Sequence, residues 1–195
     1  KVDSSFASHL AYPYPYTPTP VFDLVDTQGI GGSTCFRRTG DEGLFRRLRG
    51  FPSGGVPAYE YEGEARIMVL MGINDVNGHG KTAAQTASCL KTGWSYIANS
   101  LGAKPVVLLY PPMNGSVWGG LTPAQANSNR LSLNLAIRNA VNEFNATQLA
   151  NGKPQAEIIT SMENLYNPST ATFDGVHPNP TGATAIAQFI FWYYH

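Results

Sequence analysis

Continuous apolar runs that alternate with helical patterns constrain the fold of this chain more than any other feature of its sequence. The segments Ile67–Met71 and Pro105–Tyr110 contain no charged residue and have the length of ordinary strands. A strand that is apolar on both faces is typical of a parallel sheet covered by helices. Two further runs, Val21–Val25 and Ala156–Thr160, are expected to add strands to the same sheet.

Helical patterns occupy the segments between these runs. Thr82 and Thr122 each open a sequence of capping-box form, with glutamine three residues later, and predict helices over about 82–101 and 123–148. Pro180 is expected to start a last helix. The apolar positions of the second helix include Leu131, Leu135, Ile137, Val141 and Phe144, and those of the last are Ala183, Ile186, Ala187 and Ile190. Strands that alternate with helices predict an α/β fold, here a three-layer α/β/α sandwich around a central, mainly parallel sheet.

Length and charge limit the classes of protein to which the chain can belong. Its 195 residues fit one domain, which we expect to span 1–195. Thirteen basic residues balance thirteen acidic ones, whereas a nucleic-acid-binding surface needs a basic face. No apolar run reaches the roughly 18 residues that span a bilayer. We therefore expect a monomer that binds neither nucleic acid nor membrane.

Short polar motifs follow three of the predicted strands. GIGGST (29–34) follows the strand at 21–25, and GIND (72–75) follows the strand at 67–71. DGVHPN (174–179) lies in the loop beyond the last strand. Active groups in parallel α/β folds gather in loops at the carboxyl ends of the strands. Each motif alone is common loop chemistry, but the order and placement of all three indicate a functional site.

In this order the motifs resemble the sequence blocks of the SGNH (GDSL-type) hydrolase superfamily, and the resemblance covers essentially the whole chain. The wording GVHPN is especially similar to carbohydrate acetyl esterases, such as acetylxylan esterases, within that superfamily. The resemblance implies a flavodoxin-like sandwich and the chemistry of a serine esterase.

The resemblance also implies a role for each motif. Asp174 and His177 match the acid and the base, while Gly32 and Asn74 match the two donors of the oxyanion hole. A three-residue step within a turn lets the carboxylate accept a hydrogen bond from imidazole Nδ1, which leaves Nε2 to take a proton from serine. A neutral amide donor is typically worth about 3 kcal/mol in the transition state. Asp75 is expected to orient its loop through hydrogen bonds to the backbone.

The nucleophile has two possible positions near the N-terminus. One alignment pairs Asp3-Ser4 with the Asp-Ser of the first block, and the other places Ser5 as the nucleophile, followed by an apolar and a small residue. We favour Ser5. The glycine of the block is absent in both alignments, and the strand that normally precedes it would need about five residues. Ser33 and Ser116 are weaker candidates for the nucleophile.

The two cysteines, Cys35 and Cys89, fit one disulfide in a secreted protein or two separate thiols in a cytosolic one. Glycosylation sequons begin at Asn114 and Asn145. The composition is poor in lysine and glutamate and rich in asparagine, threonine, serine and glycine. We therefore expect a secreted, extracellular glycoprotein with a disulfide.

These features predict a serine esterase that removes small acyl groups, chiefly acetyl, from a plant cell-wall polysaccharide such as xylan. Trp118, Tyr110 and Tyr166 could stack on sugars, and buried packing explains each of them equally well. We expect no cofactor and no metal, because serine hydrolysis needs neither and no convincing metal-ligand spacing occurs. Two alternatives stay open: a lipase or thioesterase on the same scaffold, and a non-catalytic glycan-binding relative that lost the first block.

Overall fold

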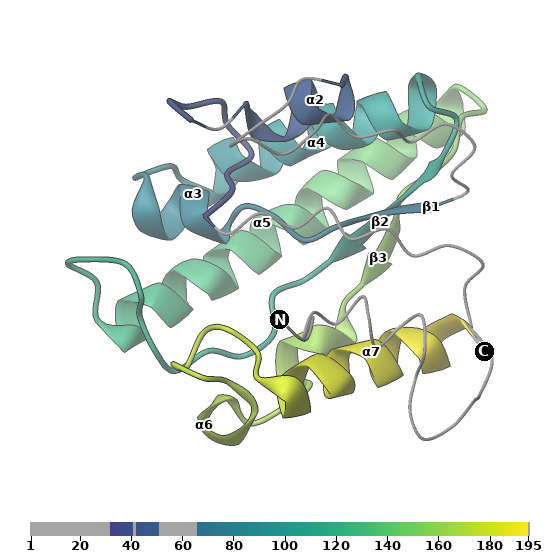
Figure 1. The fold of residues 1–195 in the computed structure, drawn as a ribbon. Helices are drawn as coiled ribbons and strands as arrows, with labels where there is room; N and C mark the ends of the chain where they lie inside the picture. The colour runs from purple at the N-terminus through teal and green to yellow at the C-terminus, as the bar shows by residue number, and fades with distance from the viewer. Residues whose placement is uncertain (1–31, 41, 51–65, 195) are drawn as a thin grey trace. The chain divides into compact units, whose positions relative to one another are not determined.

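A computed structural model describes residues 32–40, 42–50 and 66–194 of the chain (Figure 1). The predicted strand Val21–Val25 and both candidate nucleophiles, Ser4 and Ser5, lie outside these residues. The described elements are, in chain order, α2 (Gly43–Leu48), β1 (Arg66–Val69), α3 (Ile73–Gly78), α4 (Ala83–Asn99), β2 (Lys104–Leu108), α5 (Pro123–Ala150), β3 (Glu157–Ile159), the 3₁₀ turn η1 (Ser161–Asn164), α6 (Pro168–Ala171) and α7 (Pro180–Tyr194).

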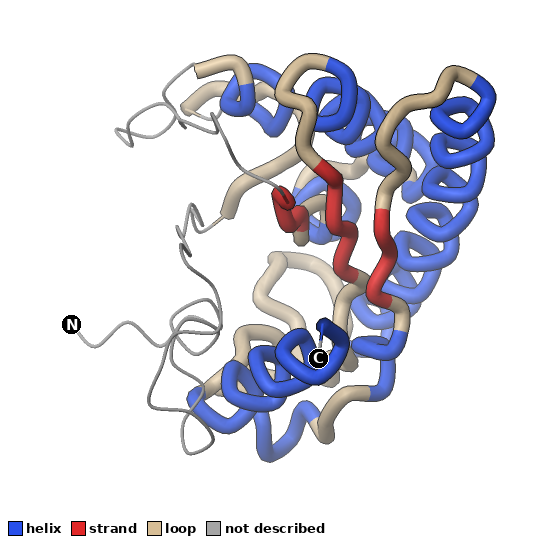
Figure 2. Tube along the Cα trace, turned by 90° about the vertical axis from the view of Figure 1, so that its right-hand side faces the viewer, coloured by secondary structure: helices blue, strands red, loops and turns tan. Residues whose placement is uncertain are grey.

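The three described strands form a parallel sheet in the order β1-β2-β3, and Figure 2 shows them side by side. Val69 pairs with Val107, and Val107 pairs with Ile158. Each strand overlaps a run predicted from the sequence, and β1 and β2 begin one residue before their runs. The α/β class and the parallel sheet flanked by helices are confirmed.

The chain contacts divide the described residues into two compact units. One contains the sheet and comprises the described residues up to 110 together with 128–160. The other comprises 111–127 and 161–194. The long helix α5 belongs mainly to the first unit, and its first turn belongs to the second.

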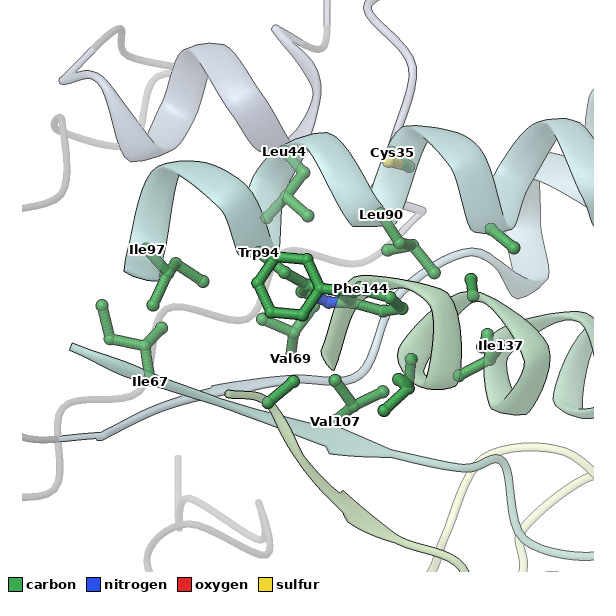
Figure 3. Close-up of a cluster of buried hydrophobic side chains, with 14 of the residues drawn as sticks. Cys35, Leu44, Ile67, Val69, Leu90, Trp94, Ile97, Val107, Ile137 and Phe144 are labelled. Carbon is green, nitrogen blue, oxygen red and sulfur yellow. The ribbon is translucent and has the colours of Figure 1, made fainter. Parts of the chain in front are cut away.

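The core of the sheet-containing unit is formed by side chains of α4 and α5 that meet those of β1 and β2 (Figure 3). Trp94 of α4 is completely buried, and its indole makes an edge-on contact with Phe144 of α5, with ring centroids 6.2 Å apart. Helix α2 reaches α4 at Gly93, where an added Cβ would lie 2.6 Å from a methyl group of Leu44. Glycine therefore permits the close approach of these two helices.

Both predicted capping boxes are present, which explains where α4 and α5 begin. The Thr82 hydroxyl accepts a hydrogen bond from the Gln85 N–H, and the Gln85 side chain accepts one from the Thr82 N–H. Thr122 and Gln125 make the same reciprocal pair, with Pro123 as the first helical residue.

The prediction for the apolar positions of α5 was partly wrong. Ile137, Val141 and Phe144 are buried, but Leu131 and Leu135 are 49% and 61% exposed. The buried stripe instead runs through Ala126, Arg130 and Leu133 to Ile137 at four-residue and three-residue steps. A residue two positions from Leu133 points to the opposite side of the helix. Leu131 and Leu135 are therefore turned away from the core.

Cys35 and Cys89 form a disulfide that ties the segment before α2 to the middle of α4. The Cα atoms are 6.1 Å apart, and the bridged residues are separated by 54 positions. A cross-link over a loop of this length typically contributes 2–4 kcal/mol to stability, mainly by restricting the unfolded chain.

The second unit contains α6, α7 and the 111–127 segment. The predicted apolar spacing of α7 is confirmed, because Ala183, Ile186, Ala187 and Ile190 are all buried. Within the described part of the chain, no helix has both the length and the apolar character required to cross a membrane.

Candidate active site

Asp174 and His177 form a hydrogen-bonded pair within one tight turn. Oδ2 of Asp174 lies 2.7 Å from Nδ1 of His177. The other carboxylate oxygen, Oδ1, accepts hydrogen bonds from the backbone N–H groups of Val176 and His177, at 2.9 and 2.7 Å. One oxygen thus fixes the turn and the second orients the imidazole, which the three-residue spacing makes possible. The His177 side chain is 65% exposed, so solvent and substrate can reach it.

The charge of Asp174 is stabilised by the same contacts. Partial burial is the largest single influence and raises the pKa of its carboxyl. The hydrogen bonds from the His177 ring and from the two backbone N–H groups together outweigh that effect, and the pKa lies below the ordinary value. Asp174 therefore remains an anion that can hold the imidazole.

The residues after His177 explain why the motif ends in Pro-Asn. Pro178 forms an isolated antiparallel bridge with Thr172, which closes the turn. The Asn179 side chain accepts a hydrogen bond from the Gly182 N–H at 3.2 Å and donates to the Thr170 and Thr172 carbonyls. Asn179 therefore caps the start of α7 and ties that helix to the segment before the acid.

The loop that contains Asn114 and Gly115, in the same unit, also supports the 174–177 turn. The carbonyl of Gly175 accepts hydrogen bonds from the N–H groups of Asn114 and Gly115, at 2.9 and 3.1 Å. A Cβ on Gly115 would overlap the carbonyl oxygen of Asp174. Glycine is therefore required at position 115 for the backbone of this loop to lie against the turn.

The proposed oxyanion residues lie in the sheet-containing unit. Gly32 has a φ of +75°, a conformation that favours glycine, so backbone geometry constrains this position. Its carbonyl accepts a hydrogen bond from Nη2 of Arg38 at 2.8 Å. Asn74 lies in the first turn of α3, and its amide donates to the Ser33 carbonyl at 3.0 Å. The structure thus brings the Gly32–Ser33 segment and Asn74 together.

Asp75, next to Asn74, also binds the segment that follows Ser33. It does so through hydrogen bonds to the backbone, as predicted. Its carboxylate is buried and accepts hydrogen bonds from the N–H groups of Cys35 and Phe36, at 2.8 and 3.2 Å. Burial is the largest influence on this carboxyl and raises its pKa, against the opposing effects of the two N–H groups and of His79. Asp75 is thus a structural anchor.

The weaker serine candidates make contacts that suit structural roles. The Ser33 hydroxyl accepts a hydrogen bond from Nη1 of the buried Arg47 at 3.2 Å. The Ser116 hydroxyl donates to the Trp118 carbonyl at 3.3 Å.

Three residues that support the candidate site were not assigned this role from the sequence: Gly115, Thr172 and Tyr110. Gly115 and Thr172 act through contacts with the 174–177 turn that no local pattern predicts. Tyr110 was considered as a sugar-stacking residue, but it is buried and its hydroxyl accepts a hydrogen bond from the Ile73 N–H. The capping role of Asn179 could have been read from the Asn-Pro step that precedes α7.

Replacing Asp75 by asparagine is expected to destabilise the protein by about 1–3 kcal/mol at pH 7, because an NH₂ group would face a backbone N–H in place of an acceptor. The raised pKa of Asp75 contributes stability that is present below the unfolded-state pKa of about 3.9 and is lost as the pH rises through the folded-state value. Urea unfolding at a series of pH values should therefore show a larger advantage of the wild type over Asp75→Asn near pH 4 than at pH 7. Glu143→Gln, which removes an exposed carboxylate, should change stability by less than about 0.5 kcal/mol. An Asp75→Asn variant as stable as the wild type would contradict the anchoring role.

Several solved structures share this fold. A carbohydrate esterase family 3 protein from Talaromyces cellulolyticus is 18% identical, with a TM-score of 0.50, and the match covers 67% of this chain and 56% of that one. A carbohydrate acetylesterase from Sinorhizobium meliloti is 12% identical, with a TM-score of 0.52, and the match covers 79% of this chain and 76% of the other. The chain thus spans little more than half the length of the Talaromyces protein. At such identities the likeness shows a common fold.

Curated protein sequences provide no match to this chain. Among protein families, the model of the GDSL-like lipase/acylhydrolase family matches residues 12–190. Because this match covers nearly the whole length, the chain belongs to the GDSL-like lipase/acylhydrolase family.

Proposed function

We propose that this protein is a serine esterase that hydrolyses small acyl esters. The observation that carries the proposal is the 2.7 Å contact between Asp174 and an exposed His177 imidazole. With the proton on Nδ1 held by the carboxylate, Nε2 is the acceptor that a serine hydroxyl requires. Membership in a family of acylhydrolases supports the same reaction class.

In the proposed reaction, the hydroxyl of Ser5, or of Ser4, attacks the acyl carbonyl while His177 takes its proton. The tetrahedral intermediate then expels the alcohol, which receives that proton from His177. Water, activated by the same imidazole, cleaves the acyl-enzyme and restores the serine. Asp174 stays ionised throughout and stabilises the imidazolium form of His177.

Gly32 and Asn74 are the proposed donors to the oxyanion. The contact between the Asn74 amide and the Ser33 carbonyl, and the Asp75 anchor beneath it, support a rigid arrangement of these two segments. Donors that are fixed before the reaction need not reorganise when charge develops on the oxygen.

An acetylated polysaccharide such as xylan is the substrate that we propose. The similar folds of a carbohydrate esterase and a carbohydrate acetylesterase support this choice. Phe173, which directly precedes the acid, is 69% exposed, and its N–H donates to the His177 carbonyl at 2.9 Å. Its exposed ring offers an apolar face on which a sugar could stack.

We further propose that the protein is secreted, since a disulfide suits an oxidising compartment. Of the two sequons, Asn114 is the better candidate for a glycan because its side chain is exposed and, within the part of the chain that the structure describes, its amide makes a single hydrogen bond, to the exposed Ser169 hydroxyl. The Asn145 amide lies within α5 and makes two short hydrogen bonds to the backbone of Ala156. A glycan on Asn145 would compete with that pair.

Covalent labelling tests catalysis and the position of the nucleophile together. After treatment of the chain with an organophosphate, mass spectrometry should find an adduct on Ser5, and His177→Ala should greatly slow its formation. An adduct on Ser4 would correct the alignment. The absence of an adduct on any serine would overturn the proposal in favour of a non-catalytic relative.

Substrate profiling separates an acetyl esterase from a lipase or thioesterase. We expect the highest kcat/KM on p-nitrophenyl acetate, a steep fall as the acyl chain lengthens, and release of acetate from acetylated xylan. A preference for acyl chains beyond about six carbons would favour the lipase alternative. Activity on acetyl esters without release of acetate from xylan would reject the polysaccharide alone.

Gly115→Ala should lower kcat by roughly 10- to 100-fold, because the added methyl group overlaps the Asp174 carbonyl and displaces the acid–base turn by a fraction of an ångström or more. Gly119→Ala is a matched control in the same loop, since nothing lies within 4 Å of a Cβ at that position. Its kcat should stay within twofold of the wild type. Equal activities of the two variants would show that the 111–121 loop does not position the turn.

A further inference from the structure

Helix α3, which contains Asn74, begins without a side-chain cap of its own. The residue at its N-cap position is Gly72, which has a φ of +121° and no side chain with which to accept a hydrogen bond. An added Cβ there would lie 2.7 Å from a methyl group of Thr86, so a capping residue such as serine does not fit. The first N–H groups of a helix have no partner within the helix and must find one elsewhere.

Tyr110 provides that partner from a distant part of the chain. Its hydroxyl oxygen accepts a hydrogen bond from the N–H of Ile73, the first residue of α3, at 3.1 Å. Tyr110 lies just beyond the carboxyl end of β2, and Gly72 lies just beyond that of β1. Neighbouring parallel strands therefore bring the tyrosine and the helix start to the same edge of the sheet.

The position of Tyr110 is itself fixed by α5. The Asn134 side chain accepts a hydrogen bond from the Tyr110 N–H at 2.9 Å and donates one to the Tyr110 carbonyl at 3.0 Å. Nη1 of Arg130 donates to the same carbonyl at 3.0 Å. All three residues are buried, so these hydrogen bonds are shielded from bulk solvent. The backbone of Tyr110 is thus fixed at both its N–H and its carbonyl, and the rigid ring carries the hydroxyl from there.

We infer that Tyr110 is a positioning residue that sets the start of α3 and thereby the direction of the Asn74 amide. Asn74 follows Ile73 directly, so a shift of the Ile73 peptide changes the geometry of the Asn74 side chain. The inference rests on the proposed role of Asn74 as an oxyanion donor. It assigns Tyr110 a part in catalysis without contact with the substrate.

The chemistry of the phenol suits this role. Burial is the largest influence on the Tyr110 hydroxyl and raises its pKa, and the nearby Asp75 carboxylate adds to that rise, against the hydrogen bond from Ile73. The hydroxyl therefore stays neutral over the whole range in which a serine esterase works. Its contact with Ile73 should not change with pH.

The test is a double-mutant cycle between Tyr110→Phe and Asn74→Ala, measured as kcat and KM on p-nitrophenyl acetate. Asn74→Ala should lower kcat by about 100-fold or more, as the loss of an oxyanion donor does. Tyr110→Phe, which removes one buried acceptor, should lower kcat about tenfold and leave KM within twofold. In the Asn74→Ala background the same change should alter kcat by less than twofold, because no donor is left to misplace.

Tyr96→Phe is the control, since the Tyr96 ring packs edge-on against Phe45, in a different part of α4 from Thr86 and Leu90, which lie near Gly72. It should leave kcat unchanged in both backgrounds. Circular dichroism and thermal unfolding would check that every variant is folded at the assay temperature. An equal effect of Tyr110→Phe in both backgrounds, or none in either, would overturn the inference. An Asn74→Ala variant with full activity would instead overturn the proposed oxyanion role, and the inference with it.

Discussion

The buried carboxylate of Asp75 accepts hydrogen bonds from the backbone of residues 35 and 36, and this contact joins the start of α3 to a segment about 40 positions earlier in the sequence. Without this contact, the N–H groups of residues 35 and 36 would lose their acceptor and a buried carboxylate would lose its donors, which is costly. The Asn74 amide adds a bond to the Ser33 carbonyl, and the disulfide at Cys35 holds the same segment against α4. The geometry of the proposed oxyanion donors depends on this set of contacts.

The acid–base pair is built in another way. The Asp174 carboxylate forms hydrogen bonds with the backbone N–H and with the ring of His177, only three positions later. Most of the contacts that hold the pair together therefore lie within the turn itself. The Thr172–Pro178 bridge and the Asn179 cap close it. Among the described residues, Asn114 and Gly115 add a contact from a distant segment. Local construction explains why this motif can be identified from a few letters of sequence.

Sequence reasoning succeeded where a feature depends on residues close together along the chain. Apolar runs predicted the described strands, and the Thr-x-x-Gln pattern predicted where α4 and α5 begin. It was wrong for Leu131 and Leu135, because a helix with apolar residues on several sides does not show which side meets the sheet. It could not assign Tyr110, because the choice between sugar stacking and packing depends on Ile73, which lies 37 positions away.

The sequence by itself determined the α/β class, the family and the spacing that lets Asp174 reach His177, since each depends on local periodicity or on a short motif. Only the tertiary structure decided which groups hold those motifs in place. Asp75, Tyr110 and Gly115 each contact a segment that is far from them in the sequence. Such contacts depend on how distant segments are placed in space, so the sequence of one segment cannot predict them.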